Sequence, residues 1–203
     1  MDNQDHTASG YEFAALTPER WPDFERLFGR GGAYGGCWCM WWFEPGGEFE
    51  RMKGEPNRLA MKGLVEAGAM PGILAYRAGE PVGWCAFGPR ENYPRLQRAR
   101  LLKPLDDQPV WSVVCFYVAR PERRKGLTPA LLLAVIQAVR ERGGRIVEGY
   151  PNLPKEGGHG DPFVYTGMLS SFLRAGFVEM ARPSQRKAIV RYAIPGPGEM
   201  AGG

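Results

Sequence analysis

The chain carries a basic, glycine-containing run that could bind an anion. Arg123-Arg124-Lys125-Gly126 lies between an apolar segment that ends at Val118 and another that begins at Leu127. Backbone N–H groups at a helix start lack intrahelical partners and lie at the positive end of the helix dipole, so they attract phosphate. Gly126 lets the backbone approach such a ligand closely. The pattern predicts a phosphate-binding turn, although the same turn could merely connect a strand to a helix.

The segment 37–43 is unusually aromatic and contains Trp38, Trp41, Trp42 and Phe43. Tryptophan faces attract cations, so this segment could hold an amine. Ordinary core packing is the favoured interpretation, because most large aromatic side chains are simply buried. Cys37 and Cys39 in the same segment have no second thiol pair nearby, and the chain has two histidines, so a zinc site is not expected.

A single glutamate, Glu148, stands inside the apolar segment 145–150. Such a carboxylate could take part in proton transfer, but a salt bridge at the end of the sheet explains it equally well. His159 lies in the glycine-rich segment 157–160 and could also carry a proton, although exposure to solvent is the favoured interpretation.

Apolar periodicity predicts the elements that position these residues. Strands are expected over 11–16, 73–76, 82–87, 110–118, 145–150, 177–181 and 188–194, and helices over 17–28, 57–67, 127–142 and 168–175. The segment 110–118 should be a strand buried on both faces in the middle of a sheet. The crossover rule then makes 145–150 parallel to it. The secondary structure of 37–43 stays open, and 90–108 is expected to be a long loop that could gate a site.

Composition favours one folded domain. The 203 residues are 44% hydrophobic, which is enough for one sizeable core over 11–194, with a flexible stretch over 1–10 and a disordered tail over 195–203. A net charge of +4 without a long basic block suits a small anionic ligand better than a nucleic acid.

Location is inferred from what the chain lacks. No apolar run approaches the length of a membrane span, and the first residues do not resemble a secretion signal, so a cytoplasmic location is expected. The cysteines are expected to be free thiols, with Cys85 and Cys115 buried in strands.

The order of elements resembles the GCN5-related N-acetyltransferase (GNAT) family over roughly residues 11–194. In that family the central strand leads into an Arg/Gln-x-x-Gly-x-Gly/Ala turn that wraps the pyrophosphate of coenzyme A. Arg123 and Gly126 match this turn, whereas Thr128 departs from its last small residue. The segment 171–177 is similar to the family's late helix and following Gly-Phe. The resemblance implies an α/β (α+β) fold with a mixed, mostly antiparallel sheet, one parallel βαβ unit and flanking helices.

The resemblance also implies acetyl-CoA as the cofactor. Backbone groups of the central strand would hold the pantetheine arm, and the Val118 N–H would stabilise the oxyanion. The cofactor-binding residues that it implies are Phe116, Tyr117, Val118, Arg123, Arg124, Lys125, Gly126, Leu127, Thr128, Asn152 and Phe172.

The catalytic groups are harder to assign. The central strand has no acidic residue, so Glu148 is the best remaining carboxylate for a general base. The family often places a proton-donating tyrosine where this chain has Phe172, so either Tyr165 replaces it or coenzyme A leaves as the thiolate. Trp38, Trp41 and Trp42 lie where the family places its acceptor pocket.

Three functions remain under consideration. The first is an N-acetyltransferase that acts on a small-molecule, peptide or protein amine, without nucleic-acid or membrane partners, and a homodimer is also considered. The second is a catalytically silent acyl-CoA-binding sensor, suggested by Phe172 and the missing strand carboxylate. A nucleic-acid module ranks last, because its binding would have to rest on scattered basic turns.

Overall fold

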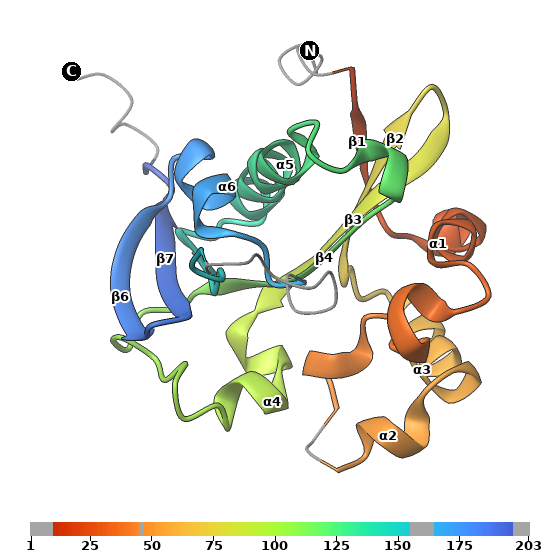
Figure 1. The fold of residues 1–203 in the computed structure, drawn as a ribbon, viewed down its shortest axis with the longest axis horizontal. Coiled ribbons are helices and arrows are strands. Elements are labelled where there is room, and N and C mark those ends of the chain that lie inside the picture. The colour runs from red at the N-terminus through yellow and green to blue at the C-terminus, as the bar shows by residue number, and fades with distance from the viewer. Residues whose placement is uncertain (1–9, 45–46, 155–164, 197–203) are drawn as a thin grey trace.

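A seven-stranded mixed sheet forms the centre of the protein in a computed structural model (Figure 1). The structure describes residues 10–44, 47–154 and 165–196. The strands follow the order β1-β2-β3-β4-β5-β7-β6, and their bounds are β1 Glu12–Ala15, β2 Gly72–Arg77, β3 Glu80–Pro89, β4 Trp111–Val118, β5 Ile146–Gly149, β6 Val178–Ser184 and β7 Lys187–Ala193. Neighbouring strands are antiparallel, apart from β4 and β5, which are parallel. The fold class expected from the sequence is confirmed.

Helices cover both faces of this sheet (Figure 1). One face carries α5 (Leu127–Glu141) and α6 (Leu169–Arg174), and the other carries α1 (Trp21–Phe28), α2 (Phe49–Met52), α3 (Glu55–Glu66) and α4 (Pro94–Gln97). Short helical turns lie at η2 Pro18–Arg20, η3 Gly32–Gly36, η4 Met40–Trp42, η5 Arg90–Asn92 and η6 Arg120–Glu122. The βαβ unit β4-α5-β5 therefore crosses one face, while the N-terminal helices close the other.

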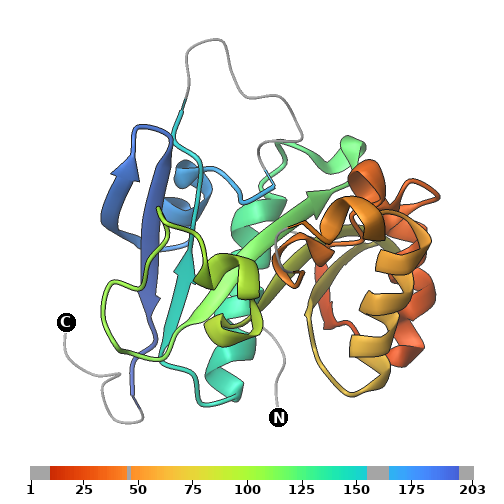
Figure 2. The same cartoon turned by 90° about the horizontal axis from the view of Figure 1, so that it is seen from below.

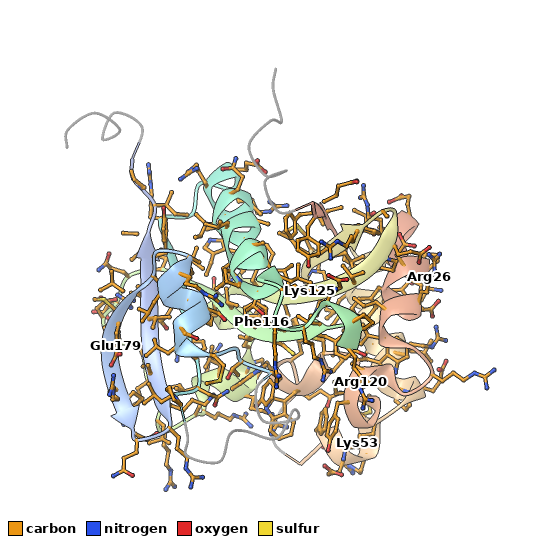
Figure 3. The ribbon with its side chains drawn as sticks, turned by 45° about the horizontal axis from the view of Figure 1, so that its top comes forward. Arg26, Lys53, Phe116, Arg120, Lys125 and Glu179 are labelled. Atoms are coloured by element: carbon orange, nitrogen blue, oxygen red, sulfur yellow. The ribbon has the colours of Figure 1, made fainter. Side chains whose placement is uncertain are left out.

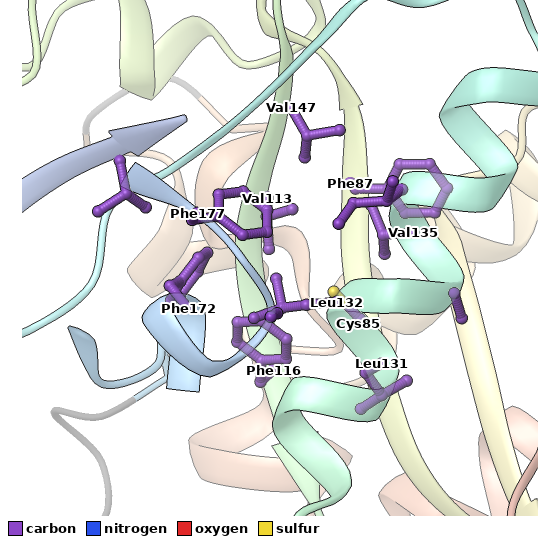
Figure 4. Close-up of a cluster of buried hydrophobic side chains, with 14 of the residues drawn as sticks. Cys85, Phe87, Val113, Phe116, Leu131, Leu132, Val135, Val147, Phe172 and Phe177 are labelled. Carbon is purple, nitrogen blue, oxygen red and sulfur yellow. The ribbon is translucent and has the colours of Figure 1, made fainter. Parts of the chain in front are cut away.

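The core under α5 explains why this helix lies on the sheet. Leu131, Leu132 and Val135 form one stripe of α5 and pack against Val113 of β4 and Phe87 of β3 (Figure 4). All five are almost fully buried. Each contributes roughly 1.5–3 kcal/mol through loss of apolar surface from water. This packing fixes the start of α5 next to the end of β4.

The opposite face has a second, more aromatic core. Phe24 of α1 lies edge-on to Trp84 of β3 with 4.9 Å between ring centres, and Phe28 stacks on Trp38 at 5.8 Å. The segment 37–43, which the sequence left open, forms η4 after two residues with positive φ, Trp38 and Cys39. Tertiary packing, rather than local periodicity, therefore shapes this segment.

Two expectations about elements need correction. The segment 90–108 is not one long loop, because it contains η5 and α4, and Tyr93 and Leu96 are buried. Four-residue helices are too short to produce a recognisable period, so the sequence did not reveal them. The end of β4 is also less enclosed than expected, since Tyr117 and Val118 are only half-buried where β5 no longer covers them.

The predicted flexible tails and His159 lie outside the described residues, except for residue 10 and the first two residues of the predicted C-terminal tail. Among the helices that the structure does describe, none is long and apolar enough to span a membrane.

Candidate functional site

The parallel strands β4 and β5 separate, and a cavity lies beside the part of β4 that β5 no longer pairs with. They pair only from Trp111 to Val113 on β4 and from Val147 to Gly149 on β5, after which they diverge (Figure 2). A cavity of about 700 Å³ opens beside the free end of β4, and its size falls within the usual range of ligand sites. The described residues that line it are Phe28, Ala33, Tyr34, Cys37, Cys115, Phe116, Tyr117, Val118, Arg120, Arg123, Thr128, Tyr165, Gly167, Met168 and Ser171.

Residues 165–168, called the wall segment, bridge part of this gap. The Phe116 N–H donates to the Tyr165 carbonyl at 2.6 Å, so one donor of β4 is already engaged. Backbone N–H groups two residues apart on a strand point to the same side, which places the Val118 N–H on the same edge of β4. Val118 also lines the cavity, so this N–H is the better placed of the two for a ligand.

Phe172 does not line the cavity but fills the core next to it. Its ring is fully buried, lies 5.9 Å from the ring centre of Phe116, and packs where side chains on Gly149 or Gly167 would clash (Figure 4). The structure therefore places Phe172 as a wedge between the diverging strands. A ligand in the cavity would meet Phe116 rather than Phe172.

The turn after β4 has the geometry of an anion site. Arg124 and Gly126 have positive φ values of 64° and 83°, and α5 begins immediately afterwards with its first N–H groups unpaired within the helix. Arg123 bridges the turn and the strand, because its Nε donates to the Val118 carbonyl at 3.1 Å. A side chain built at Gly126 would meet no atom within 4 Å, so there is open space beside the turn.

A buried carboxylate anchors the turn from behind. Glu122 accepts hydrogen bonds from Tyr11 at 2.6 Å, Arg77 at 2.7 Å and Lys125 at 3.2 Å. The hydrogen bond from Tyr11, followed by the cations, holds the pKa of Glu122 below its usual value. Arg120 is not part of this cluster; it lines the cavity together with Phe116. Figure 3 shows these two residues and Lys125, which lies just before α5.

The predicted cofactor-binding residues therefore take different places. Phe116, Tyr117, Val118, Arg123 and Thr128 line the cavity, while Arg124, Lys125 and Gly126 form the turn. Leu127 is buried in the core. Asn152 supports the wall segment, since its side-chain amide donates to Thr166 Oγ1 at 3.1 Å and to the Gly167 carbonyl at 3.3 Å.

Tyr165 belongs to the cavity and lies next to two of the three predicted tryptophans. Burial raises the pKa of its phenol to about 12, although the positive charge of Arg95 partly opposes this shift. The ring of Trp42 is 6.4 Å from that of Tyr165. Trp38 is instead buried in the aromatic core against Phe28.

Glu148 lies away from the cavity in a buried ion-pair network. Its carboxylate contacts Arg90 at 3.2 Å and Arg191 at 2.8 Å and accepts a hydrogen bond from Tyr150 at 2.7 Å. Arg191 also pairs with Asp106. This arrangement corresponds to the salt-bridge interpretation of Glu148, and the structure does not bring Glu148 and Tyr165 together.

Sequence reasoning did not identify several groups near the site. Cys37 and Cys115 line the cavity as free thiols, and the pKa of each is raised, for Cys37 chiefly by burial. Arg95 of α4 stacks on Trp41 with 3.7 Å between its guanidinium carbon and the ring centre. Glu44 Oε2 and the indole nitrogen of Trp42 are buried and have no hydrogen-bond partner among the residues that the structure describes. Cys37, Trp42 and Glu44 lie close together in the chain, but Arg95 and Cys115 are far from them, so no local spacing could have joined the two sets.

The part of the chain that the structure describes contains no cluster of potential metal ligands. No three histidine, cysteine or acidic side chains in that part could hold a metal ion together. The Cys37 and Cys39 pair therefore has no third ligand there.

Comparison with known proteins adds a family and a fold. The model of the Acetyltransferase (GNAT) family matches residues 35–154, which include β4 and the turn. No curated protein matches the chain.

Solved structures share the fold at low sequence identity. A GNAT-family acetyltransferase from Streptococcus agalactiae has a TM-score of 0.54 and 12% identity, over 92% of this chain and 97% of that one. YncA from Salmonella typhimurium, solved with its cofactor acetyl-CoA, has a TM-score of 0.52 and 12% identity, over 93% of this chain and 96% of that one. PaiA N-acetyltransferase from Thermoplasma acidophilum, in complex with coenzyme A, has a TM-score of 0.51 and 11% identity, over 91% of this chain and 99% of that one.

Proposed function

The chain belongs to the GNAT acetyltransferase family, and from this premise we propose that it transfers an acetyl group from acetyl-CoA to an amine. The observation that carries the proposal is the cavity beside the end of β4 that β5 no longer pairs with, which reaches Thr128 at the start of α5. A strand edge and a helix start are both rich in backbone N–H groups, so the cavity offers donors to an amide chain at one end and to phosphates at the other.

The residues around the cavity fit acetyl-CoA. Arg120, Arg123 and Thr128 line the phosphate end, and the open space at Gly126 leaves room for a pyrophosphate against the first N–H groups of α5. The solved structures of YncA with acetyl-CoA and of PaiA with coenzyme A support the same ligand class for this fold. In our proposal, the Val118 edge of β4 holds the pantetheine arm.

Two groups of the chain are suited to assist the transfer. The thioester supplies the acetyl group, and the Val118 N–H would stabilise negative charge on its carbonyl oxygen. Tyr165 carries its proton at neutral pH, as a phenol does even at its ordinary pKa, and burial raises that pKa further, to about 12. Its phenol can therefore give a proton to the departing sulfur.

The acceptor amine would enter on the side of Tyr165, Trp41 and Trp42. Aromatic faces there attract a cation. None of the described residues that line the cavity carries a carboxylate. We therefore expect the amine to lose its proton to water, or through water to a side chain that does not itself line the cavity.

A catalytically silent acyl-CoA sensor is the second candidate. It is favoured by Phe172, which provides no phenol, and by the position of Glu148 within ion pairs rather than in the cavity. Such a protein would bind the same ligand in the same cavity without turnover.

Calorimetry with coenzyme A and a thiol-release assay with a panel of amines test both candidates. The enzyme binds coenzyme A and releases its thiol from acetyl-CoA only when a suitable amine is present. Binding without release on any amine would identify the sensor. Absence of binding at millimolar coenzyme A would refute both proposals.

A further inference from the structure

A half-buried lysine holds the wall segment from the side opposite to β4. Lys187, the first residue of β7, donates from Nζ to Thr166 Oγ1 at 2.7 Å and to the Tyr150 carbonyl at 3.2 Å. Neither acceptor is charged, and Lys187 forms no ion pair with any carboxylate that the structure describes. Burial of the ammonium group lowers the pKa of Lys187 to about 8.

The partner of Lys187 lies in the middle of the wall segment. The hydroxyl of Thr166 also accepts a hydrogen bond from the Asn152 side chain at 3.1 Å, and the Asn152 N–H donates to the Gly167 carbonyl at 2.8 Å. On the other side, the Tyr165 carbonyl accepts the hydrogen bond from Phe116 of β4. The wall segment is thus held across the gap between the separated strands, by β4 on one side and by Asn152 and Lys187 on the other.

This clamp acts on the part of the wall that faces the ligand. Tyr165, Gly167 and Met168 line the cavity, whereas Thr166 points to Lys187 and is almost fully buried. Because Tyr165 and Thr166 are adjacent, a shift of Thr166 also moves the Tyr165 phenol. An apolar side chain could fill the place of Lys187 without the cost of burying an ammonium group. A role for the charge explains why a lysine is present.

We propose that Lys187 is a positioning residue, whose ammonium group holds Thr166 and thereby sets the position of the Tyr165 phenol in the cavity. The inference rests on the proposed transferase function, since the position of Tyr165 affects catalysis only if transfer takes place.

The proposal predicts a pH dependence. Among the described residues, the groups around Lys187 are the Tyr150 carbonyl, the Thr166 hydroxyl, Asn152 and, on β6, Ser184, while the neighbouring Arg186 is exposed. None of those that face Nζ titrates near neutrality. The ammonium group is therefore intact below about pH 8 and loses a proton and its charge above it. Its contribution is present at low pH and fades as pH rises through 8.

Four variants separate positioning from general stability. Lys187→Met removes the charge and the donors, Lys187→Arg keeps them, and Thr166→Val removes the acceptor. Lys103→Met is the control, because Lys103 is exposed. We expect Lys187→Met and Thr166→Val to lower kcat by about 10- to 100-fold while the KM for acetyl-CoA stays unchanged. Lys187→Arg should recover part of the loss.

The ratio of wild-type kcat to Lys187→Met kcat gives the decisive readout, since it cancels titration of the acceptor amine. It should be largest below pH 8 and fall above it, where the neutral amine keeps only a weaker, uncharged hydrogen bond to Thr166. A ratio that does not vary with pH, or a Lys187→Met kcat equal to that of Lys103→Met, would overturn the proposal.

Hydrogen exchange tests the clamp without any turnover. If the clamp exists, the Phe116 amide should exchange about 3- to 10-fold faster in Lys187→Met and Thr166→Val, because its acceptor carbonyl becomes less fixed. Unchanged exchange at Phe116 refutes the clamp itself. If the two variants exchange faster but the wild-type protein never turns over, the proposed function is refuted and the clamp still stands.

Discussion

Tyr165 is the side chain on which the proposed chemistry depends most directly. It lines the cavity, its pKa is raised to about 12 by burial, and its backbone carbonyl is tied to Phe116. A phenol with this pKa keeps its proton throughout the physiological range and can donate it to a leaving group. In our proposal, its proximity to Trp41 and Trp42 puts it between the cofactor side and the acceptor side of the cavity.

Removal of the phenol should therefore slow transfer without weakening cofactor binding. We expect Tyr165→Phe to lower kcat by about 100-fold, at the lower end of the range for a general acid, with little change in coenzyme A affinity. Steady-state kinetics and calorimetry measure the two quantities. Tyr34→Phe serves as the control, since Tyr34 lines the same cavity but is largely exposed. A Tyr165→Phe enzyme as fast as wild type would exclude Tyr165 as the proton donor.

Glu148 should affect stability rather than chemistry. It is buried between Arg90 and Arg191, and removal of one partner from a buried ion pair leaves uncompensated charge. We expect Glu148→Gln to reduce the free energy of unfolding by roughly 3–5 kcal/mol in denaturant titrations. Glu66→Gln breaks only an exposed pair with Lys62 and should cost less than about 1 kcal/mol. Unchanged stability with a large loss of kcat would instead support Glu148 as a general base.

At the scale of elements, the turn between β4 and α5 is set by two independent devices. Positive φ angles at Arg124 and Gly126 bend the chain toward the helix start, and the buried carboxylate of Glu122 holds Lys125 and Arg77 behind the turn. The first device exposes backbone N–H groups to the cavity. The second keeps a dense basic segment folded although its charges repel each other.

A substitution at Gly126 should weaken coenzyme A binding, whereas an equally destabilising substitution elsewhere should not. Gly126→Val strains a positive φ and fills the space beside the turn, so we expect coenzyme A affinity to fall by about 10-fold or more in calorimetry. Gly143→Val is a matched control, because Gly143 also has a positive φ and open space, at the other end of α5. Both variants should lose roughly 1–3 kcal/mol of stability. Equal affinities in the two variants would contradict our placement of the pyrophosphate.

At the scale of the whole molecule, one sheet joins two cores of different character. The α5 face is mainly aliphatic and the α1–α4 face is aromatic, and β4 contributes to both. The cavity lies where β4 loses β5 as its neighbour, so its lining comes from segments on both sides of the sheet. A ligand that fills it would connect elements that the polypeptide alone leaves apart.

Coenzyme A should consequently stabilise the protein as a unit. At a concentration of 100 times Kd, binding adds about 2.7 kcal/mol to the free energy of unfolding, which raises Tm by roughly 5–10 °C for a chain of this size. We expect a single unfolding transition that moves as a whole in calorimetric scans. The Gly126→Val variant at the same ligand concentration should shift less. If millimolar coenzyme A does not change the Tm of the wild-type protein, the cavity is not the binding site of coenzyme A.

The sequence by itself determined the elements whose cause is local. Continuous β-branched and aromatic residues define β4, the apolar stripe defines α5, and the glycine after a basic run defines the turn between them. The crossover rule then made β5 parallel to β4, and the order of elements pointed to the correct family. These inferences held because neighbouring residues carry the whole signal.

Only the tertiary structure decided which side chains meet. Glu148 could be assigned to ion pairs only once Arg90 and Arg191, each more than forty residues away, were placed beside it. Likewise, Lys187 could be connected with Tyr165 only when β7 and the wall segment were seen together. Such contacts follow from how strands are ordered and where they separate, and no periodicity along the chain encodes them.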